Sequence, residues 1–130
     1  MSTPSKWDHF SDEELYCPCC GKQEMDDTFM KAMVLLRRQA GFAFPVTSGY
    51  RCPSYNAKKS STGTTGPHTT GRALDIAVSR GNCFELIRLA LASMHITGIG
   101  LRQHGDSRFI HLDDLPKLDN RPRPTIWTYT

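Results

Sequence analysis

His68-Thr-Thr-Gly-Arg-Ala-Leu-Asp75-Ile76 and Phe109-Ile-His111-Leu-Asp113 are the two stretches that decide the fold and the site of this chain. Each contains a short apolar segment, of the length of a buried strand, that is interrupted by polar residues. An unpaired carboxylate inside such a strand is costly, so Asp75 is expected to have a cation beside it. Because side chains alternate along a strand, His111 and Asp113 are expected to share one face.

His68, Asp75 and His111 together form a candidate set of metal ligands. A catalytic zinc ion takes three ligands from protein and leaves its fourth position open for water. Two imidazoles and one carboxylate suit zinc. A single histidine or strand aspartate is more often structural, but their joint occurrence in these flanking sequences favours a metal. The sequence therefore predicts one Zn²⁺ per chain in a small hydrolytic site.

The length and composition predict one globular domain that spans residues 1–130. The hydrophobic fraction of 38% and the charged fraction of 22% are typical of soluble proteins. A net charge of +3 is too small to indicate nucleic-acid binding, although it suits an anionic wall polymer. The chain lacks both an apolar run of about 18 residues and the apolar core of a secretory signal. We therefore expect synthesis in the cytoplasm and no insertion into a membrane.

The periodicity of apolar residues predicts two helices, at residues 27–41 and 84–93. Asp27 or Thr28 is expected to cap the first helix, and Asn82 the second. Strands are expected at residues 44–51, 73–78, 98–101 and 108–113, the last two forming a hairpin. This pattern predicts an α+β fold with a small, mostly antiparallel sheet and flanking helices.

Three segments are expected to lack regular structure. Residues 1–10 read as a loosely ordered arm that Trp7 and Phe10 anchor, and residues 116–130 as an extended tail. Residues 52–67 are rich in Ser, Thr, Gly and Lys and read as a long surface loop. A loop of this length is usually functional, so it is expected to form one wall of a cleft.

The chain has five cysteines, an odd number, which argues against a complete disulfide framework. Cys17-Pro-Cys19-Cys20-Gly21 and Cys52 could form a structural four-thiolate zinc site. The C-x-C-C spacing, in place of paired C-x-x-C motifs, favours buried or loosely paired thiols instead. A local disulfide to Cys52 is the third alternative.

Several motifs in the same order as here are found in the zinc D-Ala-D-Ala carboxypeptidase family, which the chain resembles. They are Ser48-Gly-Tyr-Arg51, the step from His68 to Asp75, Gly98-Ile-Gly100 and the segment that contains His111. This family includes D-Ala-D-Ala dipeptidases, phage L-alanyl-D-glutamate endolysins and murein endopeptidases, and the hedgehog signalling domain shares its fold. The resemblance extends over about residues 10–129 and is strongest with peptidases of bacteriophage or prophage type.

The resemblance implies a hedgehog-like fold and a role for each matching residue. His68, Asp75 and His111 fall on the zinc ligands of the family. Arg51 falls on the arginine that reaches the substrate and its oxyanion, and the resemblance implies substrate binding by Ser48 and Tyr50 of the same motif. The expected reaction is hydrolysis of a D-Ala-D-Ala or L-Ala-D-Glu bond in the peptide stem of peptidoglycan. We expect a monomer that acts on the cell wall after release or delivery.

The general base is the least defined part of the expected site. Many family members place an acid or a histidine three to six positions before the last ligand, whereas here Arg108 lies three positions before it. Asp113 is favoured because it shares a face with His111, where it could act as the base or hold a ligand. Asp106, in the preceding loop, is the runner-up.

A non-catalytic zinc-bearing module, which binds peptidoglycan or forms part of a phage structure, is the alternative function. The presence of Asp113 or Asp106 at the metal favours an enzyme. The absence of both from the site favours a binding module.

Overall fold

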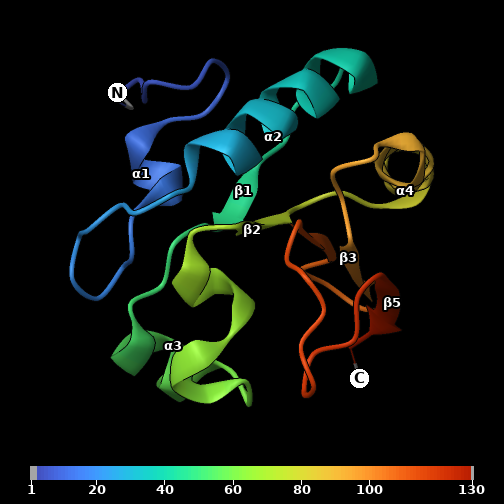
Figure 1. Cartoon of the computed structure of the whole chain (residues 1–130). Coiled ribbons are helices and arrows are strands. Elements are labelled where there is room, and N and C mark those ends of the chain that lie inside the picture. The colour runs from blue at the N-terminus through green and yellow to red at the C-terminus, as the bar shows by residue number, and fades with distance from the viewer. Residues whose placement is uncertain (1–2, 130) are drawn as a thin grey trace.

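A five-stranded sheet forms the centre of the computed structural model, which describes residues 3–129 (Figure 1). Its strands, in spatial order, are β1 (Val46–Ser48), β2 (Ala73–Ile76), β4 (Phe109–Asp113), β3 (Gly98–Arg102) and β5 (Thr125–Thr128). The first three pairings are antiparallel, and β5 pairs with β3 in parallel. The predicted α+β fold with a mostly antiparallel sheet, including the β3–β4 hairpin, is confirmed.

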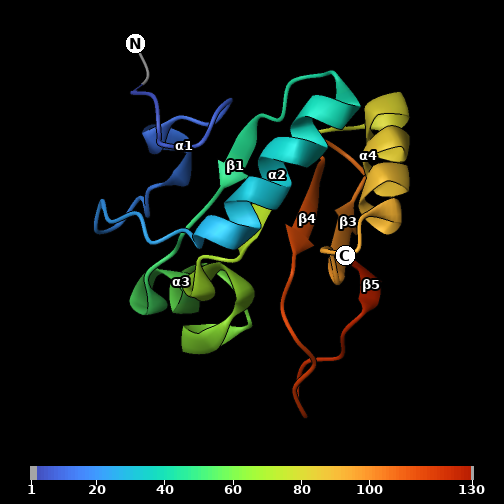
Figure 2. The ribbon, with the colours of Figure 1, turned by 45° about the horizontal axis from the view of Figure 1, so that its top comes forward.

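Two helices pack side by side against one face of this sheet, as Figure 2 shows for α2 (Asp27–Ala40) and α4 (Arg80–Ala92). The Asp26 side chain caps α2 by accepting from the Phe29 N–H at 2.9 Å, and Gly41 ends the helix in the left-handed conformation. The two caps predicted for α2, Asp27 and Thr28, therefore lie one and two residues after the observed cap. The cap predicted for α4, Asn82, lies three residues after the observed N-cap residue, Ser79.

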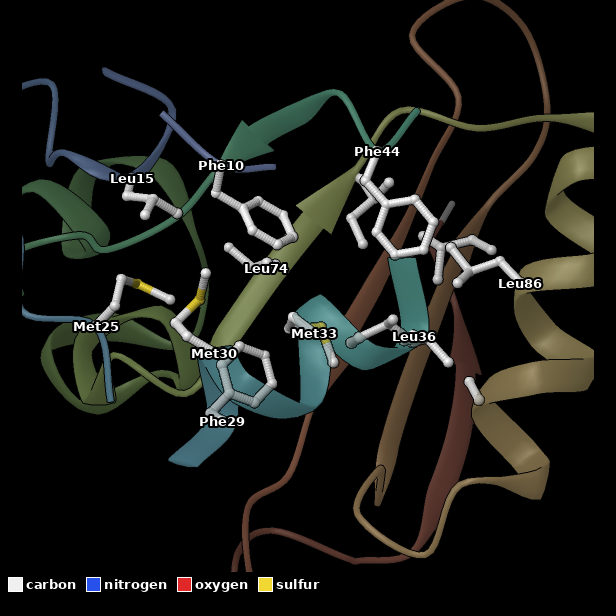
Figure 3. Close-up of a cluster of buried hydrophobic side chains, with 14 of the residues drawn as sticks. Phe10, Leu15, Met25, Phe29, Met30, Met33, Leu36, Phe44, Leu74 and Leu86 are labelled. Carbon is white, nitrogen blue, oxygen red and sulfur yellow. The ribbon is translucent and has the colours of Figure 1, made fainter. Parts of the chain in front are cut away.

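The core lies between these helices and the sheet (Figure 3). Met30 and Met33 of α2 point toward Leu74 of β2, and all three side chains are completely buried. Leu86 contributes from α4. Burial of each such side chain contributes about 1.5–3 kcal/mol, so this face of the sheet holds the domain together. The opposite face is left for polar side chains, because the strand residues alternate.

Residues 52–67 were predicted to form a loop without regular structure, and this prediction is wrong. They contain the helix α3 (Pro53–Lys59) and the 3₁₀ turn η1 (Gly63–Thr65), and a second turn, η2 (Pro67–Thr70), follows. Asn56 is fully buried and donates to Thr62 Oγ1 at 2.9 Å and to the Gly63 carbonyl at 2.6 Å. The segment therefore folds around a buried amide, which its polar composition concealed.

Both ends of the described chain pack onto the domain. Ser11 and Glu14 form a capping box at α1 (Asp12–Leu15). Residues 3–10 of the predicted loose arm are held by Trp7 and Phe10, both buried, and the Trp7 indole N–H donates to Asp27 Oδ1 at 2.9 Å. The predicted tail is extended, but it enters the sheet as β5.

The helices are all short. Within residues 3–129, none is long and apolar enough to span a lipid bilayer.

Candidate metal centre

His68, Asp75 and His111 converge on one point at the polar face of the sheet. One ligand atom from each lies within 4.8 Å of the others, and all three residues are buried. Asp75 Oδ1 is 3.1 Å from His68 Nε2 and 3.1 Å from His111 Nδ1. Tetrahedral zinc with bonds of about 2.0–2.1 Å keeps its ligand atoms roughly 3.3 Å apart. The three residues therefore fit the predicted zinc ion in both donor chemistry and spacing.

Sheet register brings two of these residues together. Asp75 on β2 lies directly opposite His111 on β4. Their strand neighbours Leu74, Ile110 and Leu112 point to the other face and are fully buried. His68 comes from η2, just before β2. The apolar residues that build the core thus also set the two ligands side by side.

The hydrogen-bond partners of the two imidazoles select which nitrogen faces the metal point. His68 Nδ1 donates to the Gly49 carbonyl at 2.8 Å, which leaves the lone pair on Nε2. His111 Nε2 donates to Asp113 Oδ2 at 2.8 Å, so Nδ1 is the nitrogen that faces Asp75 and the metal point. Such partners orient metal-binding histidines and raise their basicity. Both rings are therefore arranged for metal binding before any metal arrives.

Asp113 lies behind His111, away from the metal point. Its carboxylate is completely buried and accepts from Arg123 Nε at 2.9 Å and Arg123 Nη2 at 2.8 Å, in addition to His111. Burial raises the pKa of Asp113, but the hydrogen bonds from His111 and Arg123 outweigh it and lower the pKa to about 2. Asp113 is thus an ionised carboxylate that holds His111 in place. The geometry supports the ligand-holding role and not the role of general base.

The electrostatic field of the site favours a bound cation. Burial raises the pKa of Asp75, yet the adjacent His68 and His111 hold it well below its usual range. Burial lowers the pKa of His111, but its hydrogen bonds to Asp113 and Asp75 raise it to about 9. Two buried carboxylates thus flank one imidazole, and a metal ion would neutralise part of this charge.

Arg51 lies beside the centre, as predicted. Its Nη2 is 3.9 Å from Asp75 Oδ2, and its Nη1 donates to Asn56 Oδ1 at 3.2 Å. The buried Asn56 therefore orients the guanidinium while it also holds the Thr62 hydroxyl and the Gly63 carbonyl. Sequence reasoning missed Asn56, because an asparagine in a Ser- and Lys-rich segment is typical of a surface loop.

Three other predicted site residues lie elsewhere. Tyr50 is buried in the core, where burial and a hydrogen bond to Glu24 raise its pKa to about 12. Ser48 pairs with Asp75 across β1 and β2 but does not line the cleft. Asp106 is exposed in the β3–β4 loop and does not line it either. Substrate binding by Tyr50 and general-base action by Asp106 stay predictions; the structure places the Tyr50 side chain in the core and Asp106 in an exposed loop.

The two glycines of Gly98-Ile-Gly100 make room for the centre. Gly98 lies opposite Asp113 in the β3–β4 register, and Gly100 lies opposite His111. A Cβ atom on Gly98 would overlap the Asp113 carboxylate, and one on Gly100 would lie 2.7 Å from the Trp127 ring. The ring centroid of Trp127 is in turn 5.1 Å from that of His111. Sequence reasoning used this motif without a physical explanation, which the structure supplies.

A cleft of about 720 Å³ opens over the two histidines. One wall comes from residues 60–68, near the green helix α3, and the other from residues 118–129, in the red C-terminal segment (Figure 1). The second wall includes the basic residues Arg121 and Arg123 and the aromatic residues Trp127 and Tyr129. Within residues 3–129, no carboxylate lines this cleft.

Tyr129 offers a neutral donor at the cleft. Burial, with a contribution from the charge of Asp75, raises the pKa of its phenol to about 12. The hydroxyl therefore keeps its proton at neutral pH.

A family model described as Peptidase M15 matches residues 8–113. The matched region contains Arg51 and all three candidate ligands, whereas Arg123 and Trp127 lie beyond it. Neither a curated protein nor a solved structure matches the chain.

Proposed function

The chain belongs to the Peptidase M15 family, and from this premise we propose that it is a zinc-dependent peptidase acting on the peptide stem of bacterial peptidoglycan. The observation that carries the proposal is the convergence of His68, Asp75 and His111, of which the two histidines line the cleft. Peptidases of this family are metal-dependent, and the donor set here suits zinc.

The residues around the centre would have different roles in amide hydrolysis. A zinc ion held by the three ligands would lower the pKa of a water molecule and polarise the scissile carbonyl. Asp113 and Arg123 keep the His111 ring in the orientation that metal binding requires. Arg51 presents N–H groups that can bind a developing oxyanion, and Asn56 fixes their direction.

The charge of the cleft supports an anionic peptide as substrate. Arg121 and Arg123 line it, and no carboxylate of the described residues does. Arg123 is paired with the buried Asp113, and Arg51 lies 3.9 Å from Asp75 Oδ2 beside the centre. Stem peptides of peptidoglycan carry free carboxylates on their D-residues, which guanidinium groups bind well. The proposal covers two bonds, D-Ala-D-Ala and L-Ala-D-Glu, and the enzyme acts as a monomer without nucleic acid.

A second candidate function follows from the absence of a carboxylate in the cleft lining of residues 3–129. Asp113 is engaged behind His111, and Asp106 is outside the cleft, so neither is placed to accept a proton from water. This observation favours a zinc-bearing module that binds peptidoglycan, or serves in a phage structure, without cleaving it.

Incubation of the zinc-loaded protein with purified sacculi and defined muropeptides tests both candidates. An enzyme releases new amino groups in a chelator-sensitive manner, and mass spectra of the fragments identify the bond. His111→Ala should abolish release, whereas His95→Ala, at an exposed histidine outside the cleft, should not. Binding to sacculi without release would support the second candidate. New reducing ends on the glycan, or cleavage of an all-L protein such as casein, would contradict the proposed substrate class.

A further inference from the structure

Four of the five cysteines form a cluster separate from the His–Asp–His centre. The sulfur atoms of Cys17, Cys20 and Cys52 lie within 4.8 Å of one another. Cys19 is exposed and directly precedes Cys20 in the same turn. The fifth cysteine, Cys83, is buried on α4, outside this thiol cluster.

We propose that Cys17, Cys20 and Cys52 bind a second, structural zinc ion, with the Cys19 thiol at the fourth position. Zinc–sulfur bonds of about 2.3 Å place the sulfur atoms of a tetrahedral site roughly 3.8 Å apart. The upper limit of 4.8 Å on the separations of the Cys17, Cys20 and Cys52 sulfur atoms is compatible with this spacing. Three or four soft thiolates with no imidazole or carboxylate among them are the donor set that selects zinc over harder cations.

The backbone around Cys17 has the geometry of a metal-binding turn. The Gly21 N–H donates to the Cys17 carbonyl at 2.8 Å, and the Cys17 N–H donates to the Lys22 carbonyl at 2.8 Å. Gly21 has a φ of +72°, which favours glycine and closes the turn. Cys17 and Cys20 are therefore brought to the same side with C-x-x-C spacing. The C-x-C-C spacing that argued against a metal is misleading, because Cys17 pairs with Cys20 rather than with Cys19.

The partner segment is already directed at this turn. The Cys52 backbone N–H donates to Cys17 Sγ at 3.3 Å, and Ser54 Oγ lies 3.5 Å from Cys52 Sγ. Donors aimed at sulfur stabilise the thiolate form that a metal requires. Two segments more than thirty positions apart thus supply both the ligands and the hydrogen bonds around them.

A metal here would compensate for the lack of other structure in its surroundings. Residues 17–26 form neither a helix nor a strand, and most of their side chains are exposed. The end of α1, just before this region, is tied to the site-bearing segment, since the Tyr50 N–H donates to the Leu15 carbonyl at 3.1 Å. Cys52 directly follows Arg51. The proposed ion therefore clamps the turn to the segment that carries Arg51.

The metal content of the protein tests this proposal. Protein purified anaerobically with a reductant should contain two zinc ions per chain. Replacement by Co²⁺ should give a thiolate-to-cobalt charge-transfer band, which ligation by histidine and aspartate alone cannot produce. Cys17→Ser, Cys20→Ser and Cys52→Ser should each lose the band and one metal ion. The matched control Cys83→Ala should retain both.

The outcome is independent of the proposed peptidase activity, because His111→Ala should lose the first ion but keep the thiolate band. One zinc per chain without that band overturns the proposal, as does a disulfide between Cys17 and Cys52 in the anaerobic protein. If the serine variants fail to fold, the metal count and the cobalt spectrum of the unmodified chain decide the question.

Discussion

At the scale of single residues, the site depends on buried charges whose partners are all supplied by the chain. Asp113 accepts four hydrogen bonds, two from Arg123, one from His111 and one from the Leu115 N–H, and is completely shielded from solvent. A buried ion with full pairing is tolerated, whereas removal of one partner is strongly destabilising. Asp113 is thus a positioning residue for His111.

Asp113→Asn should lower zinc affinity by about 10–100-fold and leave turnover nearly unchanged once zinc is saturating. The neutral amide keeps the shape of the carboxylate but weakens its hold on the His111 N–H. Chelator competition measures the affinity, and assays at several zinc concentrations separate occupancy from kcat. Asp106→Asn, in the exposed loop, is the control and should change neither quantity. A fall in kcat of about 10²–10⁴ at full occupancy would instead make Asp113 the general base.

Arg51→Lys should reduce kcat/KM by about 10²–10³ while zinc stays bound. Lysine keeps the positive charge but loses the planar fork that reaches both Asn56 and the space beside Asp75. The matched control is Arg38→Lys, at an exposed arginine that pairs with Asp8. Equal activity of the two variants would show that charge alone is sufficient at position 51.

At the scale of elements, strands β3 and β4 carry the site through their register. Gly98 and Gly100 lie opposite Asp113 and His111, so both the ligand on β4 and the residue that holds it face a residue without a side chain. The space is taken by the Asp113 carboxylate and by the Trp127 ring of β5. The parallel strand β5 can approach the centre only because β3 is bare at these positions.

Gly100→Ala should destabilise the domain by about 1–3 kcal/mol and weaken zinc binding. The added methyl group would lie 2.7 Å from the Trp127 ring and would displace β5 from the His111 side of the sheet. Thermal unfolding and zinc titration measure the two effects.

Gly81→Ala is the matched control for this substitution. Position 81 lies within α4, and a Cβ atom there meets nothing within 4 Å. Alanine at this helical position should stabilise the domain by roughly 0.5–1 kcal/mol. If Gly100→Ala behaved in the same way, the assignment of Gly100 as a spacer for Trp127 would be incorrect.

At the scale of the whole molecule, one sheet separates two environments. The face toward α2 and α4 buries methionine, leucine and phenylalanine side chains, and the other face carries the ligands and the cleft. The core is therefore built without the metal, and the ligands are positioned by the core.

Removal of the metal should lower the unfolding temperature without unfolding the domain at room temperature. An ion present at 100 times its Kd stabilises the native state by about 2.7 kcal/mol, which chelation would remove. Circular dichroism of the chelated protein and its thermal transition provide the measurement. Zinc should raise the unfolding temperature less in His111→Ala than in the unmodified chain. The difference between the two increases is the contribution of the His–Asp–His centre. Complete unfolding on chelation would show that the core is insufficient by itself.

Local patterns in the sequence were enough to predict the features that depend on near neighbours. Strand alternation set His111 and Asp113 on one face, the apolar period located α2, and the polar interruption at Asp75 indicated a ligand. The first two predictions are confirmed because a strand has a period of two residues and a helix a period of 3.6, whatever surrounds them.

Tertiary structure alone decided which distant groups meet. The partner of Asp113 is Arg123, Arg51 is held by an asparagine from a segment that reads as loop, and Tyr50 turns into the core rather than the cleft. Cys17 meets Cys52 in the same way. No sequence period encodes such contacts, since they arise from sheet register and from packing between segments that are remote along the chain.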